Sequence, residues 1–125
     1  MTNQVSVLVV EDHLVSMQRV DEMLKFLRYT VHTAGSAEDA IPLIKLHQFD
    51  ILVSDLNLPG MSGFDLAKFA MAHQPALKVI FISGFGYLVA EKTDFEFILL
   101  PKPYSLMQLA ETMQNVLQRP EEFSP

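Results

Sequence analysis

Short apolar runs alternate with amphipathic segments along the chain, and this alternation is the feature that most limits its fold. Most of the runs are rich in Val, Ile, Leu or Phe, and none exceeds six residues. Such runs are typical of strands buried on both faces, as in parallel sheets. The strands predicted in this way are Val5–Val10, Thr30–Ala34, Ile51–Ser54, Val79–Ile82 and Phe97–Leu100.

The segments between these strands carry apolar residues at three- and four-residue steps, which predicts amphipathic helices. Ser36 with Asp39, and Ser105 with Gln108, resemble the capping boxes that open helices. Pro42 lies beyond the first turn of the second helix, where proline removes a hydrogen bond, so we expect that helix to be less regular. The predicted helices cover about 14–27, 36–47, 64–73 and 105–117, with a short one at Tyr87–Lys92.

Alternating strands and helices imply an α/β fold, with a parallel sheet wound right-handedly and covered on both faces. The 125 residues suit one domain, 1–125. We expect its core at about 4–118 and a tail or linker stub at 119–125.

Composition excludes several classes of function. There is no cysteine, so neither a disulfide nor a thiolate metal site can form. No apolar stretch approaches the length of a membrane span, and the N-terminus lacks the features of a signal peptide, so we expect a cytoplasmic protein. With 15 acidic against 9 scattered basic residues, direct binding of nucleic acid is not expected.

Polar side chains follow the predicted strands where each one ends. Glu11 and Asp12 follow the first strand, Asp55 the third, Ser83 the fourth and Lys102 the fifth. The carboxyl ends of parallel strands share one edge of the sheet, where such folds bind ligands. We therefore expect three carboxylates, one hydroxyl and one ammonium to gather there.

This set of groups suits phosphoryl transfer. Neighbouring carboxylates repel one another unless a cation lies among them, and ligands that are all oxygen favour a hard cation such as Mg²⁺. A carboxylate such as Asp55 can act as the nucleophile that forms an acyl phosphate. Ser83 and Lys102 are donors suited to phosphoryl oxygens, since positioning and charge neutralisation are most of what this transfer requires.

Four motifs carry a resemblance to a known family. They are VLVVEDH, LVSDLNLPGMSGFDL, VIFISG and LLPKPY, each at a strand end and in this order. With them the chain resembles the receiver domain of two-component response regulators, of the chemotaxis-regulator type, over about residues 4–118. The resemblance implies a flavodoxin-like fold with five strands in the order 2-1-3-4-5.

The resemblance also implies roles for individual residues. Asp55 would accept the phosphoryl group from a phosphohistidine on a sensor histidine kinase or a histidine phosphotransfer protein. Mg²⁺ would be held by Glu11, Asp12, Asp55 and the backbone carbonyl of Asn57. The chain would then signal through altered protein contacts, to a downstream protein or an effector domain, rather than act as an enzyme on a separate substrate.

Two further family roles fall on Ser83, which would hydrogen-bond the phosphoryl group and act in switching, and on Lys102, which would pair with that group. The Lys102–Pro103 bond is expected to be cis. The family's aromatic switch position is occupied here by Leu99, so Phe97, two residues earlier on the same strand face, is a second candidate.

The segment between Ser83 and Lys102 is shorter than the family usually has, so the fourth helix is expected to be short or irregular. Phe85 lies two residues after Ser83, on the path of the water that would hydrolyse an acyl phosphate. We predict that Phe85 shields the phosphoryl group.

Two other interpretations of the same residues each meet a specific obstacle in the sequence. A haloacid dehalogenase would place its nucleophilic Asp at the end of the first strand, where this chain has Glu11. A nucleotide- or flavin-binding domain would need a glycine- or hydroxyl-rich loop where this chain is acidic. The alternative left open is a pseudo-receiver that binds partners without phosphorylation. The four histidines, His13, His32, His47 and His73, show no metal-ligand spacing and are interpreted as structural or surface residues.

Overall fold

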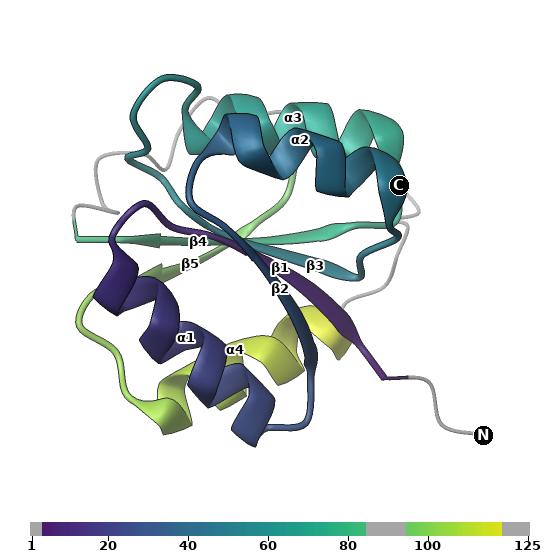
Figure 1. The fold of residues 1–125 in the computed structure, drawn as a ribbon. Helices are drawn as coiled ribbons and strands as arrows, with labels where there is room; N and C mark the ends of the chain where they lie inside the picture. The colour runs from purple at the N-terminus through teal and green to yellow at the C-terminus, as the bar shows by residue number, and fades with distance from the viewer. Residues whose placement is uncertain (1–3, 85–94, 119–125) are drawn as a thin grey trace.

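Five parallel strands form one sheet in the order β2-β1-β3-β4-β5, as the resemblance implied. The structure is a computed structural model that describes residues 4–84 and 95–118 (Figure 1). The strands are β1 (Ser6–Val10), β2 (Thr30–Ala34), β3 (Ile51–Asp55), β4 (Lys78–Ser83) and β5 (Ile98–Pro101). The predicted strands are therefore confirmed, with β5 one residue later than expected, so that Phe97 precedes it.

The helices within the described residues are α1 (Leu14–Phe26), α2 (Ala37–Leu46), α3 (Gly63–His73) and α4 (Leu106–Gln118). Figure 1 shows α2 and α3 together on one face of the sheet and α1 and α4 on the other. The predicted short fourth helix at Tyr87–Lys92 lies outside the described residues. Among the described residues, no helix combines the length and the apolar character that a membrane crossing requires.

Two apolar cores, one on each face, explain why the central strands β1, β3 and β4 are largely apolar. Leu8 and Phe81 point to the core beneath α2 and α3, whereas Val9 and Ile80 point to the core beneath α1 and α4. Successive side chains of a strand point to opposite faces of the sheet, so a central strand needs apolar residues at both its odd and its even positions. The contiguous apolar runs follow from this burial.

Local signals set the helix starts. Ser36 accepts a hydrogen bond from the Asp39 amide at 3.0 Å, as predicted. At the start of α4, the Ser105 hydroxyl accepts the Gln108 amide at 3.1 Å and the Gln108 side chain accepts the Ser105 amide at 2.8 Å. This is the reciprocal pair that defines a capping box.

One expectation for the helices needs correction, and one helix starts with an exposed apolar residue. Leu14, the first residue of α1, is 61% exposed, whereas Val20 and Leu24 of the same helix are buried. Pro42 lies inside α2, and the helix nevertheless runs without interruption from Ala37 to Leu46.

Candidate functional site

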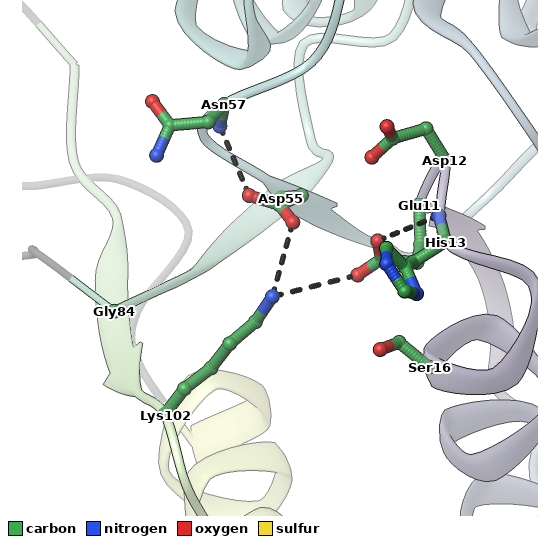
Figure 2. Close-up of a pocket in the computed structure, with 8 residues that line it drawn as sticks. All are labelled: Glu11, Asp12, His13, Ser16, Asp55, Asn57, Gly84 and Lys102. Carbon is green, nitrogen blue, oxygen red and sulfur yellow. Dashed lines mark hydrogen bonds and ion pairs between the residues drawn. The ribbon is translucent and has the colours of Figure 1, made fainter.

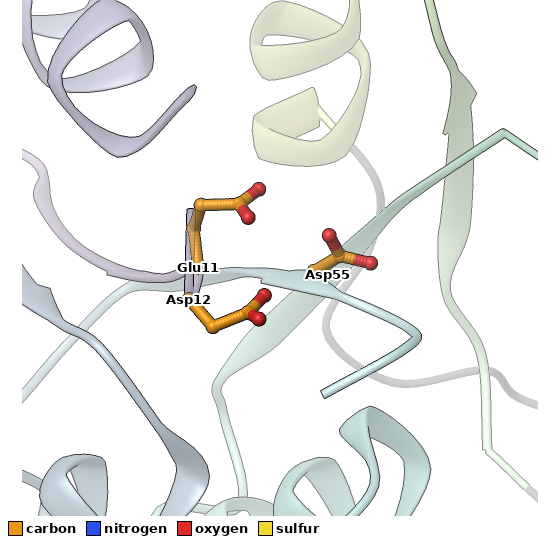
Figure 3. A group of neighbouring side chains, drawn as sticks. All are labelled: Glu11, Asp12 and Asp55. Carbon is orange, nitrogen blue, oxygen red and sulfur yellow. The ribbon is translucent and has the colours of Figure 1, made fainter. Parts of the chain in front are cut away.

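Three carboxylates meet at the carboxyl edge of the sheet (Figure 3). β1 and β3 are neighbours in register, with Val10 beside Ser54, so Glu11 and Asp55 emerge next to each other. With Asp12, they offer carboxylate oxygens that all lie within 4.8 Å of one another. Glu11 and Asp55 are only 5% and 7% exposed, whereas Asp12 is exposed.

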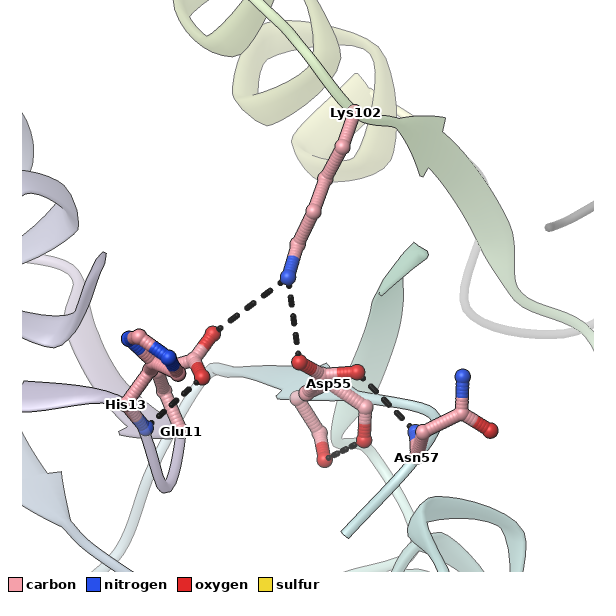
Figure 4. Close-up of polar contacts among 6 residues, drawn as sticks. Glu11, His13, Asp55, Asn57 and Lys102 are labelled. Carbon is pink, nitrogen blue, oxygen red and sulfur yellow. Dashed lines mark hydrogen bonds and ion pairs between the residues drawn. The ribbon is translucent and has the colours of Figure 1, made fainter. Parts of the chain in front are cut away.

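Lys102 supplies the positive charge at this site (Figure 4). It follows β5, and its Nζ lies 3.2 Å from Oδ2 of Asp55 and 3.8 Å from Oε1 of Glu11. The Lys102–Pro103 peptide bond is cis, as expected. One ammonium among three carboxylates leaves the site with an excess of negative charge.

The carboxylates are held by backbone groups as well. The Asn57 amide donates to Oδ1 of Asp55 at 2.9 Å, and the His13 amide donates to Oε2 of Glu11 at 3.0 Å (Figure 4). Asp55 therefore has one oxygen facing Lys102 and the other facing the loop that follows β3. This arrangement fixes the orientation of the carboxylate before any ligand binds.

Burial raises the pKa of the Glu11 carboxyl, and the charges of Asp55 and Asp12 raise it further. The His13 amide and Lys102 oppose this rise without cancelling it. Burial, assisted by the negative charges of Glu11 and Asp55, also raises the pKa of the Tyr104 phenol to about 12, against the opposing charge of Arg19. Tyr104 is therefore a neutral phenol at physiological pH.

An open cavity of about 450 Å³ contains these groups (Figure 2). His13, Ser16 and Gly84 also line it, and none of the three was predicted as a site residue. Ser16 lies in the first turn of α1, four residues after Asp12. Its closeness in sequence to the acid pair is the signal that was available for it, but that closeness does not show which way its side chain faces.

The donor set fits Mg²⁺. Its side-chain ligands are carboxylate oxygens alone, and a small hard cation prefers a few such oxygens with waters completing its shell. Asn57, whose backbone carbonyl was predicted as a further ligand, also lines the cavity.

The predicted residues Ser83, Leu99 and Phe97 are not among the described residues that line this cavity. Ser83 ends β4, is 2% exposed and precedes Gly84, which lines the cavity. Leu99 and Phe97 both pack against the core beneath α2 and α3, although Phe97 precedes β5. The ring of Phe97 lies 5.0 Å from that of Phe81. Phe85 lies outside the described residues, so its shielding role stays a prediction.

Comparison with known proteins agrees with this geometry. The model of the response regulator receiver domain matches residues 7–114. The chain is 33% identical over 124 residues to the sensor kinase CckA of Brucella abortus, covering 95% of this chain and 13% of that protein. It is 35% identical over 116 residues to the cell cycle response regulator CtrA of Brucella ovis, covering 90% of this chain and 50% of that protein. The chain thus spans half or less of the length of these two relatives.

Solved structures share the fold. The receiver domain of the hybrid histidine kinase CckA is 30% identical with a TM-score of 0.79, over 90% of this chain and 99% of that one. A response regulator receiver protein from Sinorhizobium medicae is 21% identical with a TM-score of 0.86, over 96% of this chain and 98% of that one. Because the receiver model spans most of the chain and the acid cluster lies at the expected edge of the sheet, the chain belongs to the response regulator receiver domain family.

Proposed function

We propose that this receiver domain accepts a phosphoryl group on Asp55 from a phosphohistidine donor, in a reaction that depends on Mg²⁺. A receiver domain is a signalling module rather than a classical enzyme. The observation that carries the proposal is the position of Asp55, whose carboxylate faces Lys102 at 3.2 Å inside a cavity shared with two more carboxylates.

In the proposed reaction, an oxygen of Asp55 attacks the phosphorus atom of the donor and forms an acyl phosphate. The bond from phosphorus to the donor's ring nitrogen breaks, and its electron pair stays on the imidazole. Mg²⁺, when bound, neutralises charge on the phosphoryl oxygens. Glu11, Asp12, Asp55 and the Asn57 carbonyl would hold that ion, and Lys102 would turn from Asp55 to the phosphoryl group.

Signalling would follow from a change in protein contacts after phosphorylation. We assign Ser83 to a hydrogen bond with the phosphoryl group, because it ends the strand beside Asp55. Leu99 and Phe97 are the candidates for relaying that change, since both pack on the face beneath α2 and α3. A downstream protein, or an effector domain joined to this one, would read the altered surface.

Receiver domains interact with histidine kinases. We propose a sensor histidine kinase or a histidine phosphotransfer protein as the donor, in the cytoplasm. One relative is a sensor kinase and another a response regulator, so the chain's similarity fits a receiver in either setting. In both, residues 4–118 would form the receiver unit.

The test is phosphorylation of the purified protein with acetyl phosphate and Mg²⁺, followed by intact mass spectrometry. The wild type should gain one phosphoryl mass, and this gain should disappear with a chelator or in Asp55→Asn. Asp65→Asn, which removes an exposed acid in the first turn of α3, should phosphorylate like the wild type. No adduct from either acetyl phosphate or a phosphohistidine donor, in a folded protein, would favour the pseudo-receiver alternative.

A further inference from the structure

We propose that Glu38, in the first turn of α2, is a positioning residue for the acceptor site. Its carboxylate holds the loop between β3 and α3 in the conformation that places Asn57 beside Asp55. The proposal rests on the proposed function, because its consequence is for Mg²⁺ binding and phosphorylation. Glu38 lies outside the cavity and touches none of the reacting groups.

The contact joins two parts of the chain that are distant in sequence. Oε2 of Glu38 accepts a hydrogen bond from the backbone amide of Met61 at 3.1 Å. The donor lies in the loop that follows β3, and the acceptor lies on a helix that packs beside α3 (Figure 1). A carboxylate that accepts a backbone N–H makes a charge-assisted hydrogen bond, which is stronger than a neutral one.

Gly60 makes room for this contact. A Cβ atom built on Gly60 would lie 2.8 Å from the same Oε2 of Glu38, which is closer than Cβ atoms in proteins lie to other heavy atoms. Gly60 also has a φ of +77°, a conformation that glycine adopts readily and other residues rarely adopt. Glycine at position 60 therefore permits both the positive φ of the loop and the close approach of the Glu38 carboxylate.

The same loop carries the groups that orient Asp55. The Asn57 amide donates to Oδ1 of Asp55, and Asn57 lines the cavity. At the base of the loop, the Gly63 amide donates to the Leu56 carbonyl at 3.3 Å, and Leu58 is buried in the core. Packing and backbone bonds thus hold the base, whereas Glu38 holds the tip from a separate element.

This division of roles predicts a selective effect. The contact is solvent-exposed, so its loss should change the free energy of unfolding little. Its loss should instead widen the range of positions available to Asn57 and its carbonyl. Groups that orient metal ligands without touching the metal commonly change affinity by about tenfold or more. Because Leu58 still anchors this loop, we expect Glu38→Ala to weaken Mg²⁺ binding about three- to tenfold.

Asp39→Ala is the matched control, because Asp39 is an exposed acid of the same helical turn. Its backbone amide donates to Ser36, and Glu38, not Asp39, makes the side-chain contact to the loop. Both alanine variants remove one negative charge and one favourable interaction with the helix N-terminus. Glu38→Gln is the second comparison, since its amide oxygen can still accept the Met61 amide.

The experiment measures Mg²⁺ affinity by calorimetry, the rate of phosphorylation by acetyl phosphate, and the amide NMR signal of Met61 without metal. We expect Glu38→Ala to shift the Met61 signal, weaken Mg²⁺ binding and slow phosphorylation at subsaturating Mg²⁺. Saturating Mg²⁺ should restore most of the rate. Asp39→Ala and Glu38→Gln should stay within about twofold of the wild type.

Equal Mg²⁺ affinities for Glu38→Ala and Asp39→Ala would overturn the proposal, because charge loss alone would then explain the effect. An unchanged Met61 signal in Glu38→Ala would overturn it as well. Failure of the proposed function gives a different result. The wild type itself would then take up neither Mg²⁺ nor a phosphoryl group, and the role assigned to Glu38 would fall with it.

Discussion

At the scale of single residues, Glu11 is where the requirements of folding and of the site oppose each other. Its side chain is buried, and its pKa is raised mainly by that burial. An acid with a raised pKa in the folded state destabilises that state when it is ionised. We therefore expect Glu11→Gln to raise the free energy of unfolding of the metal-free protein at pH 7, measured by urea denaturation.

The pH dependence of this gain has a definite sign. Below the ordinary pKa of about 4.5, Glu11 is protonated in both states and the variant has no advantage. The advantage grows as the pH rises through 4.5 and is complete above the raised pKa of the folded state. Glu22→Gln, an exposed position on α1, is the control and should differ little from the wild type. A Glu11→Gln variant less stable than the wild type at pH 7 would contradict this account.

Gly63 shows a second constraint at this scale. A Cβ atom there would lie 2.5 Å from the backbone oxygen of Asp55 and 3.1 Å from the Cα of Leu56, and backbone atoms cannot move aside cheaply. We expect Gly63→Ala to lower the free energy of unfolding by about 1–3 kcal/mol. At Gly35 nothing lies within 4 Å of such an atom. Gly35→Ala should therefore be neutral or slightly stabilising, and equal losses for the two variants would refute the steric explanation.

At the scale of helices and strands, the sequence predicts what depends on neighbouring residues and misses what depends on distant ones. The strand runs and the capping pair of Ser105 and Gln108 are local patterns, and the structure confirms them. The burial of Gln74 is different. Nothing near it in sequence indicates that this polar residue, only 6% exposed, joins α3 to the end of α2.

Gln74 makes three hydrogen bonds across that junction. Its Nε2 donates to the carbonyls of Ile44 and His47 at 2.9 and 2.7 Å, and its Oε1 accepts the Phe49 amide at 2.7 Å. Gln74→Leu leaves these backbone groups without partners, so we expect a loss of about 2–4 kcal/mol in the free energy of unfolding. Gln114→Leu, an exposed position on α4, is the control for thermal or urea unfolding. A Gln74→Leu variant as stable as that control would show that water replaces all three bonds.

At the scale of the whole molecule, the site exists because the sheet order brings distant segments to one edge. Glu11 and Asp55 meet because β1 and β3 are neighbours, and Lys102 reaches them from beyond β4. The parallel arrangement predicts this gathering from sequence, since every strand ends at the same edge. It does not predict which acid is buried, or that His13 and Ser16 line the cavity, because those depend on how α1 packs.

From the excess of carboxylates over ammonium groups at this edge, we predict that Mg²⁺ stabilises the fold. A ligand that binds only the folded state stabilises it by about 2.7 kcal/mol at a concentration one hundred times its Kd. We expect that increase in stability on adding Mg²⁺ to the wild type, and its full reversal by a chelator, in thermal unfolding.

Asp12→Asn should abolish most of the increase, and because Asp12 is exposed the metal-free variant should remain folded. Asp65→Asn, with the same loss of charge away from the cavity, should keep the increase. An equal increase in all three proteins would place the ion elsewhere than among Glu11, Asp12 and Asp55, since only Asp12→Asn removes one of those ligands.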